Sequence, residues 1–390
     1  GTSGAAAGGI TTIVDMPLNS NPTTTTPEIF KQKLEAAEGK LKVDAAFWGG
    51  LVPENSGNHT LLEEMVKMGV LGFKAFMVNS GINDFAKSPK AVLAEALPLL
   101  SRYGVPLYVH AEDAPDDPPT PEGDPTKYAT YLASRPREWE SNAIKQLIEL
   151  SNEFKGTPIH VAHLSDADSL PLLKDAKASG SKITVETCPH YLYFAAEEIP
   201  DGKNSGTLYK CAPPIREAEN RDRLWEGLQE GVIDLIGSDH SPSTGDMKEI
   251  QSGNFLKAWG GINGLQMGLA ATWTAGLKRG ITYENIAQWW SEAPAKLAGL
   301  TKTKGSLVAG KDADFVVWDP EEDYDTRTEY YHHKNKETPY KDLPLKGYVW
   351  STFVRGQEVY RNGHVSEEGC GKPVLKELNL FEKGAAALKK

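Results

Sequence analysis

The 390-residue sequence has little of what marks several large classes of protein. Its three cysteines, Cys188, Cys211 and Cys370, form no C-x-x-C pair, so no disulfide framework is expected and a reducing, cytoplasmic location is the default. No apolar run approaches the roughly 20 residues needed to cross a bilayer, so no membrane partner is expected. The net charge of −11 argues against a nucleic-acid partner, because phosphate binding requires a basic face.

Two informative motifs are also missing. No glycine-rich phosphate loop follows a predicted strand, which counts against a dinucleotide-binding open sheet. The nine histidines contain no His-x-His pair, the spacing that places two imidazoles on one face of a strand. The function must therefore be read from residues spread along the chain.

Short apolar, β-branched runs alternate with helical stretches up to about residue 300. Such strands, separated by helices, predict a parallel sheet that is covered on both faces. The predicted strands are residues 11–16, 43–48, 72–77, 106–110, 159–163, 182–188 and 234–237, and the predicted helices include 27–38, 61–68, 90–103, 138–154 and 169–177.

The number of these units separates two α/β architectures, a barrel and a doubly wound open sheet. Seven units, preceded at residues 1–9 by a segment that resembles the tail of a helix, predict a (β/α)8 TIM barrel whose first strand lies before Gly1. The open sheet does not require ionisable residues after nearly every strand. Such residues do follow the predicted strands here, at Asp15, Lys74, His110, His163, Cys188, His190 and Asp239. We therefore predict a barrel over residues 1–304, with its active site at the C-terminal rim.

The pattern changes near Gly305. Residues 305–318 indicate a turn that enters a strand, and residues 349–354 and 358–360 are further strands, followed by a hairpin turn at 361–363. The segment after Val374 predicts a terminal helix. We therefore predict a second, small β-rich domain over residues 305–390.

Four residues at strand ends are candidate metal ligands. Lys74 is either a snorkelling lysine or, on alternation, a barrel-interior lysine that carbon dioxide converts into a metal-bridging carbamate. His110 is either a core histidine or a ligand, because neutral imidazole commonly binds transition metals. Asp239 is either a helix cap or a ligand that also moves a proton.

The fourth candidate comes from a pair of histidines, His160 and His163, three residues apart on one predicted strand. Odd spacing sends strand side chains to opposite faces, so we expect at most one of them to face the barrel centre. We choose His163, at the strand end, as the ligand and His160 as a structural residue. Together, Lys74, His110, His163 and Asp239 follow strands four, five, six and eight of the predicted barrel, an order that favours a metal site over four unrelated residues.

At this point the chain resembles the cyclic amidohydrolases of the dihydroorotase and hydantoinase group, and within them the allantoinase branch. The resemblance covers nearly the whole chain, and stretches 253–261 and 332–336 are the most specific to that branch. The residues that carry it are 15–20 (DMPLNS), 73–77 (FKAFM), 186–191 (ETCPHY), 211–216 (CAPPIR), 238–242 (SDHSP), 253–262 (GNFLKAWGGI) and 332–336 (HHKNK).

The resemblance implies hydrolysis of the cyclic amide of allantoin to allantoate at two divalent metal ions, most plausibly zinc. It implies that Lys74 is carbamylated and bridges the metals, that His110 and His163 hold the second metal, and that Asp239 binds the first and shuttles a proton. Asn19, His190, Ser241 and Asn263 match substrate-binding positions, whereas Ala212 stands where some relatives have serine. It also implies a small-molecule substrate and a homo-oligomer.

The family's His-x-His pair has no counterpart in these 390 residues. We expect it to lie before Gly1, together with any targeting signal, and we expect residues 1–390 alone to be unstable and to show little activity. Two alternatives stay open: another cyclic-amide hydrolase, such as a dihydropyrimidinase or hydantoinase, and a non-catalytic scaffold with the same fold.

Overall fold

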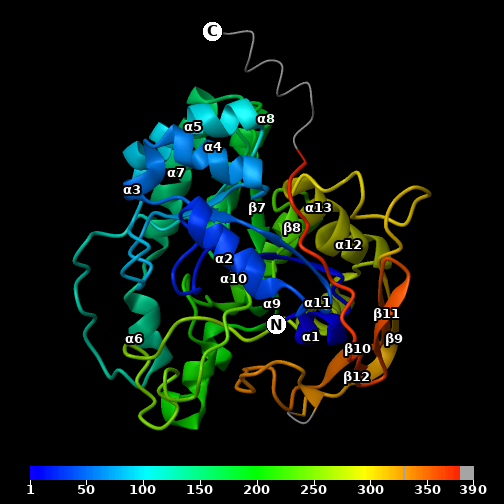
Figure 1. Cartoon of the computed structure of the whole chain (residues 1–390). Coiled ribbons are helices and arrows are strands. Elements are labelled where there is room, and N and C mark those ends of the chain that lie inside the picture. The colour runs from blue at the N-terminus through cyan, green and yellow to red at the C-terminus, as the bar shows by residue number, and fades with distance from the viewer. Residues whose placement is uncertain (328–329, 378–390) are drawn as a thin grey trace.

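The computed structural model describes residues 1–327 and 330–377, and its larger part is a parallel sheet covered by helices (Figure 1). All seven predicted strands are confirmed. The parallel strands are β1 (Thr12–Asp15), β2 (Asp44–Phe47), β3 (Gly49–Gly50), β4 (Phe73–Phe76), β5 (Leu107–His110), β6 (Ile159–Val161), β7 (Ile183–Thr187) and β8 (Leu235–Ile236).

The strand order supports the barrel over the open sheet. β1 pairs with β2, and the order from β3 to β8 follows the chain without reversal. A doubly wound sheet reverses its order at a switch point, whereas a barrel adds each strand beside the last. The segment from β2 to β3 joins the two sets, because β2 pairs with β1 and Gly49 pairs with Phe73 of β4.

The register places one layer of side chains across the middle of the sheet. Lys74 pairs with Tyr108, Tyr108 with His160, and His160 with Thr184. Adjacent partners in a parallel sheet point to the same face, and Tyr108 packs in a small apolar cluster with Trp48 and its neighbours, apart from the main core. This layer therefore lies inside the barrel.

The predicted helices are confirmed, and their ends carry recognisable caps. Asn58 precedes α4 and accepts a hydrogen bond from the Leu61 N–H at 3.1 Å, and Gly69 ends that helix with φ of 111°. Among the described residues no helix has the length and apolar character to cross a bilayer. The helices are α1 (Thr2–Ala7), α2 (Pro27–Ala37), α3 (Pro53–Ser56), α4 (His59–Met68), α5 (Lys90–Tyr103), α6 (Tyr128–Ala133), α7 (Arg137–Glu153), α8 (Leu170–Ala178), α9 (Pro189–Tyr193), α10 (Ala218–Gln229), α11 (Gly268–Gly276), α12 (Tyr283–Ala287) and α13 (Ala293–Leu297).

A four-stranded antiparallel sheet lies beside the barrel, on the right of Figure 1. Its strands confirm those predicted after Gly305, and Asn362-Gly363 forms the expected turn between β11 and β12. Residues 375–377 are not helical, and the rest of the predicted terminal helix lies outside the described residues. The division at residues 304 and 305 stays a prediction. The strands are β9 (Phe315–Tyr324), β10 (Leu345–Val354), β11 (Gln357–Arg361) and β12 (His364–Val365).

A group of buried charges ties the small sheet to the barrel. The Lys304 ammonium lies 2.6 Å from carboxylate oxygens of both Asp44 and Asp314 and 2.9 Å from Asp312. Arg355 also pairs with Asp44, at the start of β2. We call these five residues the ion cluster. It fixes the small sheet against the second strand of the chain.

Candidate active site

Three of the four predicted ligands lie at or beyond the carboxyl ends of their strands, where a barrel active site is built, and the fourth, Lys74, lies within its strand. Lys74 lies on β4 and His110 ends β5, whereas His163 and Asp239 lie two and three residues beyond β6 and β8. The rings of His110 and His163 are in edge contact, with centroids 4.5 Å apart. The charges of Lys74 and Asp239 act on each other's pKa, so the fold brings all four together.

His110 is prepared to act as a neutral ligand. Burial lowers its pKa to about 4, so its imidazole carries no charge near neutral pH. Its Nε2 lies 2.6 Å from a carboxylate oxygen of Glu112, whose pKa of about 2 reflects Arg135 and His110 overcoming the effect of burial. Nε2 therefore carries the hydrogen and donates, which leaves Nδ1 as the ligand nitrogen. A carboxylate behind a histidine is the usual arrangement that orients a metal ligand.

His163 and Asp239 adopt strained backbone conformations. Their φ angles are 36° and 39°, in the left-handed region that residues with a Cβ rarely enter. Such strain costs about 1–3 kcal/mol per residue and concentrates at functional sites. Burial also lowers the pKa of His163 well below its usual value, and its Nδ1 is buried with no hydrogen-bond partner in the described part of the chain. A neutral imidazole nitrogen of this kind is chemically able to bind a metal ion.

Lys74 is buried in an aromatic setting. Its side chain is on the barrel-interior face, and its ammonium lies 4.8 Å and 4.6 Å from the ring centroids of Phe76 and Tyr108. Burial lowers the Lys74 pKa to about 8, although the nearby charges of Asp239 and Glu186 oppose that shift. Burial raises the Asp239 pKa to about 6, with Lys74 acting in the opposite direction. Both groups therefore titrate near neutral pH.

Two residues of the 186–191 motif join this group. Ligand atoms of Cys188, His190 and Asp239 lie within 4.8 Å of one another. Burial lowers the His190 pKa to about 3, and its Nε2 has no hydrogen-bond partner among the described residues. His190 is therefore a neutral, uncommitted side chain beside Asp239, which agrees with its predicted place at the rim.

The other predicted substrate residues are placed differently. Asn19 is exposed in the loop after β1, and Ser241 donates its backbone N–H to Ile262 O at 2.9 Å. Asn263 is buried, and its amide nitrogen donates to the carbonyls of Asn335 at 2.7 Å and Glu337 at 3.1 Å. Only its Oδ1 remains without a partner in the described structure. The contacts of Asn263 thus hold a segment of the chain, and its substrate role stays a prediction.

These contacts explain part of the distinctive 332–336 stretch. The segment passes over the loop that follows β8, where Gln266 Oε1 accepts from the His332 N–H at 2.9 Å. The ring of His333 stacks on that of His240, next to Asp239, with centroids 5.8 Å apart. The stretch therefore packs against the loop that follows β8, at the rim of the barrel.

The expectation that at most one of His160 and His163 faces the barrel centre is wrong. His160 lies in the interior layer, with its ring centroid 4.8 Å from that of Tyr108 and its Nδ1 2.8 Å from Thr184 Oγ1. His163 lies beyond the end of β6, where its left-handed backbone interrupts the alternation and returns the side chain toward His110. The structural role predicted for His160 agrees with its hydrogen bond.

Sequence reasoning missed the groups that support the ligands. Below Lys74, the Tyr108 hydroxyl donates to Glu186, and Glu186 lies 3.2 Å from His160 Nε2. Tyr108 could have been found by aligning β5 with β4, because it is the register partner of Lys74 and therefore points to the same face. No local signal connects Arg135 to Glu112, because they are 23 residues apart in different elements.

Comparison with known proteins gives a consistent result. The family model described as the amidohydrolase family matches residues 1–359. A probable allantoinase of Oryza sativa is 51% identical over 96% of this chain and 76% of its own length, and the allantoinase of Arabidopsis thaliana is 49% identical over 95% and 75%. The solved L-hydantoinase (dihydropyrimidinase) of Arthrobacter aurescens has a TM-score of 0.88 and 33% identity, covering 96% of this chain and 83% of that one.

Proposed function

The chain belongs to the amidohydrolase family, and from that membership we propose that Lys74, His110, His163 and Asp239 form its metal-dependent hydrolytic site. Its activity is that of an allantoinase, the hydrolysis of the cyclic amide of allantoin to allantoate. The observation that carries the proposed site is the convergence of two neutral imidazoles and a carboxylate, at or beyond the ends of three barrel strands, with a buried lysine of β4.

The donor set in these 390 residues fits part of a site for two divalent metal ions, and the family's His-x-His pair, which has no counterpart here, would supply the remaining ligands. The Nδ1 of His163, which has no hydrogen-bond partner among the described residues, and the Nδ1 of His110, which takes no part in the contact with Glu112, are neutral imidazole nitrogens, and Asp239 adds a carboxylate. Lys74, with a pKa of about 8, has an accessible neutral amine, which is the form that adds carbon dioxide. We propose that this carbamate, with His110, His163 and Asp239, would help to hold two divalent ions, and that these ions would be zinc, which accepts imidazole and carboxylate ligands and has no redox chemistry.

Bound metal would supply Lewis acidity, which acidifies a water molecule and polarises the amide carbonyl of the substrate. The proton transfers belong to Asp239. Its carboxylate takes a proton from the attacking water and gives it to the ring nitrogen as the carbon–nitrogen bond breaks. A pKa of about 6 suits a group that must both accept and return a proton near neutral pH.

Substrate recognition is assigned to the neighbouring rim residues. His190 is the strongest candidate, because its uncommitted imidazole lies beside Asp239. Asn19, Ser241 and Asn263 are proposed to contribute through side chain or backbone. A homo-oligomer is proposed on the family resemblance.

Two other functions are separated by specific observations. The solved relatives named hydantoinase or dihydropyrimidinase favour a different cyclic-amide substrate, but they are 25–33% identical, against 36–51% for the relatives named allantoinase. A non-catalytic scaffold has no need for strained, unpaired ligand residues, and this rim contains them.

The test compares substrates and metal content in the whole gene product. We expect turnover of allantoin in preference to dihydrouracil and hydantoin, with loss of activity on chelation and recovery with zinc. Metal analysis is expected to give two ions per protomer. Preference for dihydrouracil would instead assign the chain to the dihydropyrimidinases, and failure to hydrolyse any of the three at full metal loading would contradict the proposed site.

A further inference from the structure

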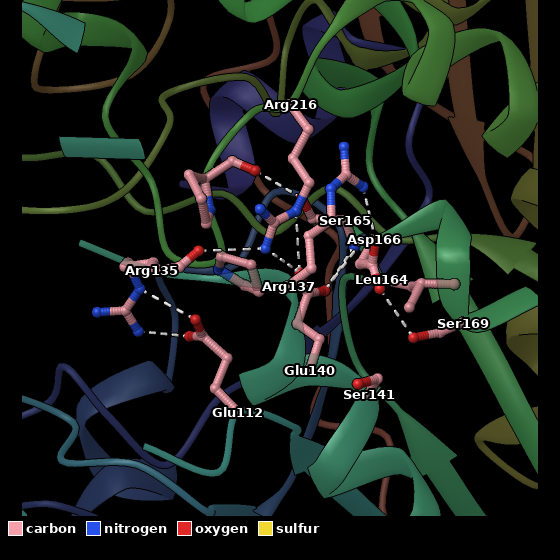
Figure 2. Close-up of polar contacts among 12 residues, drawn as sticks. Glu112, Arg135, Arg137, Glu140, Ser141, Leu164, Ser165, Asp166, Ser169 and Arg216 are labelled. Atoms are coloured by element: carbon pink, nitrogen blue, oxygen red, sulfur yellow. Dashed lines mark hydrogen bonds and ion pairs between the residues drawn. The ribbon is translucent and has the colours of Figure 1, made fainter. Parts of the chain in front are cut away.

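Glu140 lies in the first turn of α7, outside the set of proposed ligands, and is almost completely buried (2% exposed). Its Oε2 accepts the backbone N–H groups of Ser165 at 3.0 Å and Asp166 at 3.2 Å. Its Oε1 accepts from Arg216, at 2.7 Å from Nη2 and 3.3 Å from Nε. Figure 2 shows this carboxylate between the turn and the guanidinium. One side chain therefore holds two segments that are distant in sequence.

The first segment is the turn that carries His163. The strained backbone at His163, with φ of 36°, persists only if the following residues are held. The two N–H groups that bind Glu140 come two and three residues after His163, and Ser165 also donates its hydroxyl to Pro214 O at 2.5 Å. Glu140 thus fixes the backbone from which the His163 imidazole projects.

The second segment leads to His110. Arg216 also donates to the backbone carbonyl of Arg135 at 3.4 Å. Arg135 in turn donates through Nε to Glu112 at 3.0 Å, and Glu112 accepts from His110 at 2.6 Å. Successive hydrogen bonds therefore connect Glu140 to His110. Figure 2 shows the part of this chain from Glu140 through Arg216 and Arg135 to Glu112.

These buried charges have a poor explanation in stability alone. Two carboxylates, Glu112 and Glu140, lose nearly all contact with water, and apolar side chains of similar volume usually serve a core as well or better. What an ion pair supplies and an apolar contact does not is a directed, fixed geometry. Here the directed contacts end at the backbone that follows His163 on one side and at the imidazole of His110 on the other.

We propose that Glu140 is a positioning residue that sets the imidazoles of His110 and His163 as one unit, through Arg216, Arg135 and Glu112 on one side and the 165–166 backbone on the other. The proposal rests on the proposed function, because it presumes that both imidazoles bind metal. It extends the site by a residue that touches neither metal nor substrate.

Two substitutions test it, with a matched control on the same helix. Glu140→Asp keeps the charge but is one methylene shorter, so it satisfies either Arg216 or the backbone N–H groups and not both. Glu140→Gln keeps the length and loses the charge. The control is Glu149→Gln. Glu149 also lies on α7 and forms an exposed ion pair with Lys90 of α5. Substitution of a residue that orients metal ligands without binding the metal typically lowers metal affinity 10–100-fold.

The first measurement is cobalt(II) titration of the metal-free whole gene product, followed by visible absorption. We expect both Glu140 variants to bind cobalt at least tenfold more weakly and with an altered spectrum, and Glu149→Gln to match the wild type. Wild-type affinity and spectrum in both Glu140 variants would overturn the proposal. Absence of cobalt binding in the wild type would count against the proposed function instead.

The second measurement needs no metal. Carbethoxylation of each histidine by diethyl pyrocarbonate, read by peptide mass spectrometry, reports how firmly each ring is held. We expect faster modification of His163 and His110 in the Glu140 variants, with His160, held by Thr184, as the unchanged internal reference. An equal rise at His160, or failure of both variants to fold while the control folds, would mean a purely structural role and overturn the proposal.

Discussion

The rim and the ion cluster both gather ionisable side chains closely enough to hold a cation, and yet they are physically opposite. Ligand atoms lie within 4.8 Å of one another in the Cys188, His190 and Asp239 group and in the Asp44, Asp312 and Asp314 group. In the second group, Lys304 and Arg355 already occupy the centre. In the first, the His190 Nε2 is left without a partner in the described structure.

The difference shows how a binding site is distinguished from a structural salt bridge. Buried polar atoms are nearly always paired, so an unpaired one requires an explanation. The rim adds strained backbone at His163 and Asp239, whereas the ion cluster residues other than Arg355 have ordinary φ angles. Proximity of ligand atoms alone would have selected both places, whereas buried side-chain atoms without a hydrogen-bond partner in the described structure select only the rim.

The largest effect expected is on catalysis at the rim. In the whole gene product, Asp239→Asn removes the group that moves the proton, so we expect kcat to fall by about 10³-fold, within the range for loss of a general base. Metal content is expected to be largely retained, because Lys74, His110 and His163 remain. Steady-state kinetics with metal analysis checks this, and Asp201→Asn, in an exposed ion pair with Lys127, is the control. Full activity of Asp239→Asn would remove the rim from the mechanism.

The next effect is on stability at the ion cluster. Lys304→Met leaves the buried carboxylates of Asp44 and Asp314 short of a partner, and breaking a buried pair costs about 3 kcal/mol or more. We expect the free energy of unfolding to fall by that amount while activity per folded molecule is unchanged. The control is Glu230→Gln, in an exposed pair with Lys174, where the expected change is below about 1 kcal/mol. If urea titrations gave the same loss of unfolding free energy for Lys304→Met and Glu230→Gln, the ion cluster would contribute no more to stability than an exposed ion pair.

The smallest effect is the pH dependence of stability at the rim. Folded His190 has a pKa of about 3 because of burial, against an ordinary value of 6.5, so below pH 6.5 the unfolded chain binds a proton that the folded chain does not. Stability is therefore lost as pH falls, by about 2 kcal/mol between pH 6.5 and 5 for this group.

His190→Gln removes this contribution and leaves those of the other rim groups in place. Chelated wild type and variant, unfolded in urea at pH 7 and pH 5, are expected to differ in their pH-dependent loss by that amount. His364→Gln, on the exposed strand β12, is the control and is expected to follow the wild type. Identical pH dependence in all three proteins would mean that His190 is not held neutral in the fold.

Much of the barrel was predictable, because its signals are local. Each strand is an apolar run between helices. Lys74 lies within β4, and the other three proposed ligands stand at or just beyond a strand end. The prediction failed at His160 and His163, where strand alternation was extended past the last residue of β6. The backbone at His163 is left-handed, and the residues after it donate their N–H groups to the Glu186 carbonyl and the Glu140 carboxylate. Strand alternation cannot anticipate these hydrogen bonds.

By itself the sequence determined the kind of chemistry at the rim, since residue types and their places at strand ends are properties of short segments. Tertiary structure alone decided which charged groups are satisfied. Asp44 meets Lys304 across 260 positions and Glu140 meets Arg216 across 76, so neither pairing has a local signal. The pairing of a buried group is what makes it structural or leaves it free to bind, because desolvation penalises every polar atom that the fold does not satisfy.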